Sequence, residues 1–73
     1  MANLNRQFLI FLGKKIRNER DRMGISQEEL GKIAKFHRTY IGMIERGEKN
    51  ITIVNLKRVA KALGVQARDL IDF

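Results

Sequence analysis

Apolar residues recur at helical spacing near the start of the chain. Phe8, Leu12 and Ile16 fall at intervals of four residues, which places them on one face of a helix over about residues 5–22. Residues 9–11 are apolar as well, so the hydrophobic face is wider than a single core contact requires. These extra residues serve either as additional core or as a surface for a partner.

A capping box predicts the start of a second helix. Ser26 is followed three residues later by Glu29, and in this arrangement each side chain accepts a hydrogen bond from the other residue's backbone N–H. Leu30, Ile33 and Ala34 then follow at helical spacing. They are expected to form the inward face of that helix.

Three further helices are expected downstream. His37 is placed to cap a third helix that ends before Gly47, and Thr52 is placed to cap a fourth that ends at Gly64. Residues 66–72 make one last turn or two. The residues predicted to face inward are Ile41 and Ile44 in the third helix and Ile53, Leu56, Val59, Ala60 and Leu63 in the fourth.

The composition restricts both the fold and the chemistry. The 73 residues contain no cysteine and no proline, and helix-forming residues are abundant. We therefore predict an all-α fold, one compact five-helix domain spanning residues 1–73, without disulfides and suited to the reducing cytoplasm. The single histidine has no cysteine or second histidine to join it, so we expect no metal site and no cofactor. The apolar run at residues 8–12 is far shorter than the roughly 18 residues that span a bilayer, and we expect no membrane partner.

The positive charge is unevenly distributed along the chain. Residues 1–25 contain six basic and two acidic side chains and carry +4 of the net charge of +7. Residues 26–50 contain five basic and four acidic side chains (+1), and residues 51–73 contain four basic and two acidic ones (+2). This distribution favours a polyanionic partner whose phosphates bind to the flanking helices, while the nearly neutral middle segment recognises its sequence. A basic surface that only aids solubility is the alternative.

The second and third expected helices form a candidate helix-turn-helix. Gly31 is the small residue that a close helix crossing needs, and Phe36 and Ile41 are hydrophobic anchors behind the exposed helix. Such a unit places its second helix in the major groove of DNA, where arginine pairs with guanine and the threonine methyl meets thymine. We therefore predict a sequence-specific DNA-binding transcription regulator and not an enzyme, since no nucleophile–base pair or phosphate-cradling glycine loop occurs. The outward residues of the exposed helix are Arg38, Thr39, Gly42, Met43 and Arg46.

Several motifs carry a resemblance to a known family. They are IR at 16–17, GISQEEL at 24–30, YI at 40–41, IERG at 44–47 and LGV at 63–65, together with Leu12, Arg20 and Ala60. With these motifs the chain resembles the lambda-repressor-like, or Xre-family, helix-turn-helix domains over nearly its whole length. Within that family, RTYI at 38–41, IER at 44–46 and NITI at 50–53 are similar to the controller proteins of restriction–modification systems.

The resemblance implies a role for each matching residue. Gln27 would meet a phosphate, aided by the dipole of the second helix, and Arg20 with Glu45 would form an internal salt bridge. Two positions depart from the family pattern. Lys35 stands where the turn often has glycine, so it is either left-handed or the turn is remodelled, and Gly42 stands where serine is usual. Arg38, Thr39 and Met43 would face bases, with a phosphate contact as the alternative for Arg38 and packing on sugar for Met43, while Tyr40, Arg46, Lys49 and Asn50 would hold the DNA backbone or flank the base contacts.

A homodimer would give the reading helix enough base contacts for selectivity. Two such helices would lie about 34 Å apart, one turn of duplex, and would match a pseudo-palindromic operator. The dimer would activate or repress according to its position at a promoter, with RNA polymerase as a further candidate partner. The candidate dimer surface consists of Val54, Val65, Leu70, Ile71 and Phe73, and the alternative is that its three C-terminal residues fold back over the first helix.

Other functions are compatible with the same sequence. An antitoxin or another protein-interaction module would use the wide apolar face of the first helix to cover a partner protein. A phage-type repressor would share the fold, and a membrane-surface protein would depend on the first helix alone. Double-stranded DNA is the partner that we predict.

Overall fold

The computed structural model describes residues 4–73, apart from the side chain of Leu4. This part of the chain contains no strand and five helices: α1 (Leu4–Met23), α2 (Gln27–Ala34), α3 (Arg38–Glu45), α4 (Ile53–Leu63) and α5 (Ala67–Leu70). The all-α, five-helix prediction is therefore confirmed. Residues 1–3 of the predicted domain lie outside the described residues. No helix within residues 4–73 combines the length and the apolar character needed to cross a membrane.

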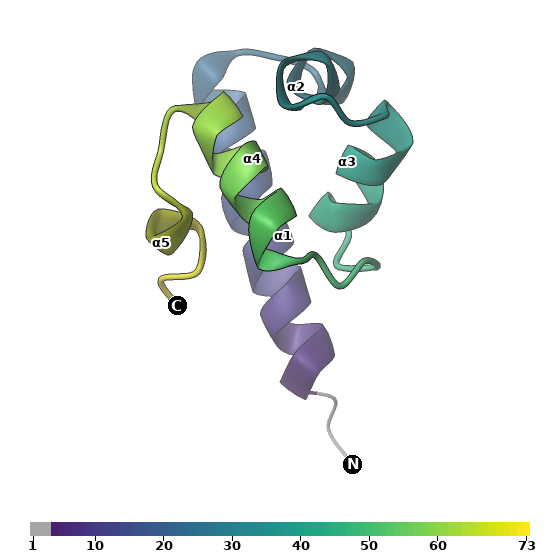
Figure 1. Cartoon of the computed structure of the whole chain (residues 1–73). Coiled ribbons are helices and arrows are strands. Elements are labelled where there is room, and N and C mark those ends of the chain that lie inside the picture. The colour runs from purple at the N-terminus through teal and green to yellow at the C-terminus, as the bar shows by residue number, and fades with distance from the viewer. Residues whose placement is uncertain (1–3) are drawn as a thin grey trace.

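The long helix α1 lies beside α4, and the shorter helices surround this pair (Figure 1). Helix α2 packs on α3 and on α4, while α3 also packs on α1. In Figure 1, α3 and α5 lie on opposite sides of the α1–α4 pair, with α2 across its upper end. One side of α3 is thus covered by the rest of the molecule, and its other side is left open.

The core lies where the four longer helices meet. Ile16 of α1, Leu30 of α2, Ile41 of α3 and Val59 of α4 are all completely buried. Their side chains belong to a single cluster of buried hydrophobic residues, because each helix turns one apolar stripe inward. The other members of this cluster are Leu12, Ile44, Leu56, Ala60, Leu63 and Leu70.

The helix starts follow the capping residues of the sequence. Ser26 and Glu29 form the predicted capping box, with reciprocal hydrogen bonds of 3.0 and 2.8 Å. His37 Nδ1 accepts a hydrogen bond from the N–H of Thr39, and Thr52 caps α4 by accepting one from Asn55. These interactions satisfy backbone donors that the first turn of a helix otherwise leaves unpaired.

Two residues predicted to face inward, Ile33 and Ile53, are exposed instead, and so is Phe8 of the apolar face of the first helix. Ile33 is 52% exposed, because the buried side of α2 is centred between Leu30, Gly31 and Ala34 and Ile33 is turned about 100° away from it. Ile53 is 63% exposed because it is the first residue of α4, where the helix extends beyond the core. Phe8 is 51% exposed and occupies the corresponding outer end of α1.

The C-terminus folds back onto α1. The Phe73 ring lies 6.0 Å from the Phe8 ring and 5.5 Å from the Phe11 ring, measured between centroids. Leu70 is fully buried in the core. Its assignment to a dimer surface is therefore wrong, because α5 turns this side chain toward the rest of its own protomer. Ile71 and Phe73 remain about half exposed.

Gly13 of α1 is a packing residue, a role that the spacing of apolar residues does not reveal. A Cβ atom at this position would lie 2.5 Å from the backbone oxygen of Glu45 and 2.6 Å from that of Ile44. The two helices α1 and α3 therefore touch backbone to backbone at this point. Only glycine permits this approach, and the approach sets the position of the end of α3.

Candidate nucleic-acid interface

The turn between α2 and α3 is held in a left-handed conformation without glycine. Lys35 has φ 65° and ψ 46°, and the Phe36 N–H donates a 2.8 Å hydrogen bond to the Gly31 oxygen. A Cβ on Gly31 would lie 2.5 Å from the Phe36 oxygen, so the turn closes tightly over this residue. Of the two alternatives for Lys35, the structure shows the left-handed one, which costs about 1 kcal/mol relative to glycine.

Arg58 of α4 supports this turn, although no local sequence signal pointed to it. Its Nη2 atom donates to the backbone oxygens of Ala34 and Lys35, each at 2.9 Å. The guanidinium carbon also lies 4.0 Å from the centroid of the Phe36 ring, in cation–π geometry. These contacts satisfy the carbonyl groups at the end of α2 and stabilise the strained residue.

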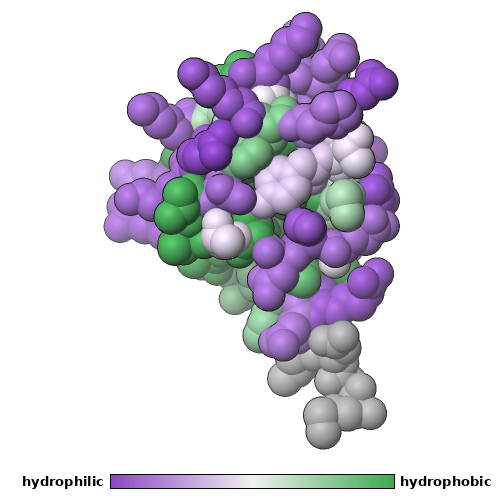
Figure 2. Space-filling view, turned by 45° about the vertical axis from the view of Figure 1, so that its right-hand side comes forward, coloured by the Kyte–Doolittle hydropathy of each residue, from purple (hydrophilic) through white to green (hydrophobic). Residues whose placement is uncertain are grey.

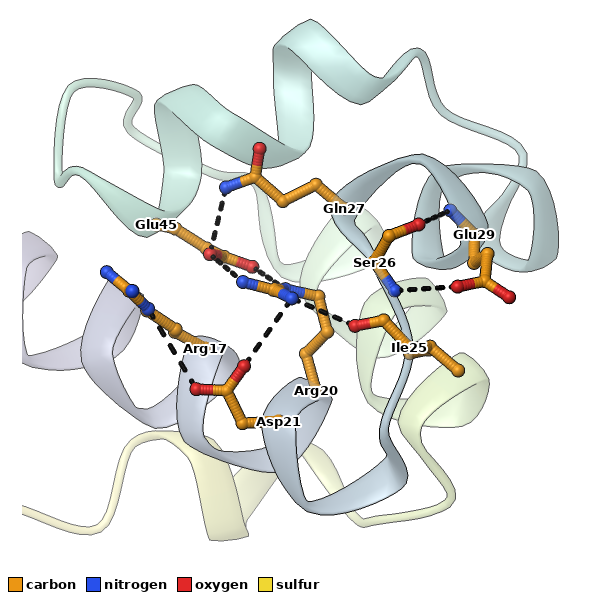
Figure 3. Close-up of polar contacts among 8 residues, drawn as sticks. All are labelled: Arg17, Arg20, Asp21, Ile25, Ser26, Gln27, Glu29 and Glu45. Carbon is orange, nitrogen blue, oxygen red and sulfur yellow. Dashed lines mark hydrogen bonds and ion pairs between the residues drawn. The ribbon is translucent and has the colours of Figure 1, made fainter.

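A network of polar side chains ties α3 to α1 and α2 (Figure 3). Arg20 donates to both carboxylate oxygens of Glu45, at 2.7 and 3.0 Å, and to the backbone oxygen of Ile25 at 2.9 Å. The Arg20 side chain is only 12% exposed, and the Glu45 side chain is 3% exposed. The hydrogen bond with Glu45 raises the pKa of Arg20 above its ordinary value, so the guanidinium stays charged. The structure thus contains the ion pair that the resemblance implied.

Gln27 belongs to the same network. Its Nε2 atom donates a 3.0 Å hydrogen bond to Glu45, and its Oε1 atom points away from that carboxylate (Figure 3). Since the amide nitrogen retains a second N–H, the hydrogen bond to Glu45 leaves a donor for a phosphate. The phosphate contact of Gln27 stays a prediction.

The free side of α3 carries the residues proposed to meet DNA. Arg38 and Thr39 in its first turn are exposed, and Met43 one turn later is partly exposed. The Arg38 Nη1 atom lies 3.5 Å from a carboxylate oxygen of Glu28, a long contact that leaves the Arg38 side chain 66% exposed. Figure 2 brings this side of the molecule forward and shows hydrophilic side chains over the upper and right-hand parts of the surface.

Tyr40 is partly buried and Gly42 is buried. The Tyr40 ring lies 4.8 Å from the Phe36 ring, and its hydroxyl oxygen accepts a 3.0 Å hydrogen bond from Asn55. Gly42 is buried although it lies on the side of α3 opposite Ile44, and its proposed part in DNA contact stays a prediction. The side chains of Gln27 and Arg46 cover it, since a Cβ here would lie 3.4 Å from Gln27 Oε1 and 3.1 Å from Arg46 Nη1.

The segment after α3 adds further polar groups. Arg46 makes two hydrogen bonds to Glu48, and Lys49 and Asn50 are exposed. No group of three or more His, Asp or Glu side chains in residues 4–73 is arranged to hold a metal ion. The arrangement can therefore offer hydrogen-bond donors and positive charge to an anionic ligand, from a helix fixed by its neighbours.

Such an open polar helix, held on a second helix by a tight turn, defines a DNA-binding helix-turn-helix domain. The chain belongs to the helix-turn-helix family HTH_3, which it matches over residues 16–70. It is 45% identical over 65 residues to control protein C.BamHI of Bacillus amyloliquefaciens, covering 88% of this chain and 80% of that protein. It is 42% identical over 60 residues to control protein C.SmaI of Serratia marcescens, covering 82% and 71%.

A solved structure agrees with these relatives. The restriction–modification controller protein C.AhdI from Aeromonas hydrophila superposes with a TM-score of 0.86, at 35% identity, over 89% of this chain and 94% of that one. The resemblance to Xre-like domains and to controller proteins is thereby confirmed. The comparisons also confirm the prediction of a DNA-binding transcription regulator. These relatives are regulators and not enzymes.

Proposed function

We propose that this protein is the controller of a restriction–modification system and binds a pseudo-palindromic DNA operator as a homodimer. The observation that carries the proposal is the exposure of Arg38 and Thr39 on a helix whose far end is fixed by the Arg20–Glu45 ion pair. A rigid helix can hold a bidentate arginine–guanine contact in register, and such a contact discriminates against a wrong base by about 1–3 kcal/mol. The likeness to three control proteins supports the narrower assignment.

The residues around this helix divide into two groups in the proposal. Arg38, Thr39 and Met43 face base edges, because they lie on the free side of α3. Lys49 and Gln27 contact phosphates beside the helix, and their contacts carry no sequence information. Arg46, Asn50 and the hydroxyl group of Tyr40 flank the base contacts.

Dimer formation is proposed because one α3 helix spans too few base pairs for selective binding. An open groove lies between α4 and the α4–α5 connection, lined by Val54, Lys57, Ala60, Lys61 and Val65. Val54 is 64% exposed in this groove, and a second copy would cover it. Ile71 and Phe73 extend the proposed surface, whereas Leu70 is excluded by its burial.

The proposed mode of action is regulation by position on DNA. A regulator of this kind acts in the cytoplasm of a bacterial cell, without catalysis, and RNA polymerase bound beside the operator is its further partner. Whether transcription rises or falls then depends on the distance between operator and promoter.

Selection of bound sites from a library of random duplexes tests the proposal. The expected product is a pair of inverted half-sites whose centres lie about one helical turn apart, with a dimer in the complex. Recovery of unrelated duplexes, or a complex insensitive to sequence, would overturn it. Copurification of a stoichiometric protein together with absence of DNA binding would favour the interaction-module alternative.

A further inference from the structure

Directly after α3, a tight turn brings a carboxylate to the edge of the proposed DNA interface. Gly47 has φ +72°, and its N–H donates a 3.0 Å hydrogen bond to the Ile44 oxygen. The N–H of Glu48 donates a 2.9 Å hydrogen bond to the Met43 oxygen. This pair of hydrogen bonds is the Schellman motif, which closes a helix with a defined backbone path.

The same turn is pressed against α1. A Cβ at Gly47 would lie 2.8 Å from Ile10 Cγ1 and 3.0 Å from the Ile10 Cα atom. Position 47 is also buried, whereas position 48 is exposed. The backbone that carries Glu48 is therefore fixed by packing as well as by hydrogen bonds.

From this position Glu48 binds the guanidinium of Arg46 along one edge. Arg46 Nε donates to Glu48 Oε2 at 2.9 Å, and Arg46 Nη2 donates to Glu48 Oε1 at 3.2 Å. The hydrogen bond raises the pKa of Arg46 and lowers the pKa of Glu48, so both groups stay charged. The Nη1 atom lies over buried Gly42 of α3, 3.1 Å from where a Cβ at that position would be.

This arrangement has opposite consequences for two modes of DNA binding. Binding to arbitrary DNA depends on the net positive charge that reaches the phosphates. A carboxylate paired with Arg46 cancels most of that charge at a distance. Binding to a matched site depends instead on donors held in the correct direction. The carboxylate leaves the Nη1 and outer Nη2 hydrogens of Arg46 available and restricts their direction.

We infer that Glu48 is a specificity-determining residue of the DNA interface, which weakens binding to arbitrary DNA and orients Arg46 for a matched site. The inference rests on the proposed DNA-binding function and adds to it. A purely stabilising role does not explain the pair, because both side chains are largely exposed, at 57% and 41%, and exposed ion pairs contribute little to folding.

The test compares Glu48→Gln with Glu19→Gln in DNA-binding titrations. Glu19 also accepts two hydrogen bonds from an arginine, Arg22, at 2.8 and 2.6 Å. Glu19 lies about 100° around α1 from Arg20, and its ion pair with Arg22 is not part of the Arg20–Glu45 network. The control therefore removes the same charge and the same kind of ion pair outside the proposed DNA interface.

The probes are a duplex selected by the wild-type protein from the random library and a scrambled duplex of identical composition. Glu48→Gln should raise affinity for the scrambled duplex by about fivefold at 0.1 M salt and steepen its salt slope by about 0.9. Affinity for the selected duplex should not rise, so the specificity ratio falls. Glu19→Gln should leave this ratio unchanged.

The variant pair Arg46→Gln and Arg46→Gln/Glu48→Gln shows whether Glu48 acts through Arg46. When Arg46 is already replaced, adding Glu48→Gln should lower the specificity ratio no more than Glu19→Gln does in the wild-type background. Thermal unfolding checks that each variant is folded. If Glu48→Gln leaves the specificity ratio unchanged, or lowers it equally with and without Arg46, the inference is overturned while the proposed function stands. If the wild-type protein shows no preference for the selected duplex, both the inference and the proposed function are overturned.

Discussion

The guanidinium of Arg20 on α1 donates hydrogen bonds of 2.7 and 3.0 Å to the two carboxylate oxygens of Glu45 at the end of α3. The residues lie 25 positions apart in the chain, and their side chains are almost excluded from water. A carboxylate in such a place needs a fixed partner, because an unpaired buried charge is strongly destabilising. The pair therefore connects the stability of the fold to the orientation of the helix that faces DNA.

Arg20→Ala should destabilise the protein, because it leaves the carboxylate of Glu45 buried with only Gln27 as a hydrogen-bond partner. We expect a loss of about 3 kcal/mol, equivalent to a fall in melting temperature of roughly 12–24 °C. Thermal unfolding followed by circular dichroism measures it. Arg22→Ala removes an exposed arginine of the same helix and should lower the melting temperature by less than about 4 °C. Equal effects of the two changes would contradict this account of the pair.

Gly13→Ala should weaken the contact between α1 and α3. An added Cβ would lie 2.5 Å from the Glu45 oxygen, so the helices must separate, at a cost of about 1–3 kcal/mol. In a free helix the same change would stabilise by roughly 1 kcal/mol, so the sign of the effect is diagnostic. Urea unfolding measures it, with Asn18→Ala on an exposed site of α1 as the control. A stabilised Gly13→Ala protein would show that the backbones do not touch.

Lys35→Gly should stabilise the turn between α2 and α3. Lys35 has φ 65°, a conformation that glycine adopts without the Cβ penalty, so we expect a gain of up to about 1 kcal/mol. The same exchange at Lys32, inside α2, should cost about 1 kcal/mol because glycine is a poor helix former. Chemical denaturation measures the free energy of unfolding of the two variants. A loss of stability in Lys35→Gly would mean that its side chain contributes more than its backbone costs.

Acid should destabilise the protein partly through the capping box of α2. The backbone hydrogen bond from Ser26 lowers the pKa of Glu29 below its ordinary value of 4.5. Because the folded-state pKa is the lower one, the contribution of Glu29 is present above about pH 4.5 and is lost as the pH falls through the depressed value. Glu29→Gln keeps an acceptor for the Ser26 N–H but cannot titrate. Its stability, measured by urea unfolding from pH 7 to pH 3, should therefore fall less than that of the wild type, and an identical pH profile would refute the assignment.

Arg38→Ala should relax the choice of DNA sequence, because Arg38 is proposed to face a base. We expect a loss of about 1–3 kcal/mol on the selected duplex and little change on a scrambled one, measured by mobility shift. Thr39→Ala should act in the same direction. Lys49→Ala, a proposed phosphate contact, should weaken binding to both duplexes equally and reduce the salt slope by about 1. If Arg38→Ala behaves like Lys49→Ala, the assigned reading face is wrong.

Features that depend on neighbours three or four residues apart could be predicted from the sequence alone. The capping box of Ser26 and Glu29, the threonine cap of α4 and the left-handed Gly64 at its end all follow from local hydrogen bonding. The five helices and most of the core follow from the spacing of apolar residues. The outward position of Arg38 was predictable for the same reason, since it lies opposite the buried stripe of its own helix.

Only the tertiary structure decided the features that depend on distant parts of the chain. The burial of Leu70 and the exposure of Ile33 depend on which other helix covers them, and helical spacing alone does not specify this. The support of Arg58 for the turn and the closeness of Gly13 to α3 join segments more than 20 residues apart. Arg46 is close in sequence both to Glu48 and to Gly42, whereas the Gln27 side chain over the same glycine comes from another helix. Periodicity thus determined which face of each helix is apolar, and packing between helices determined which polar groups remain free to bind.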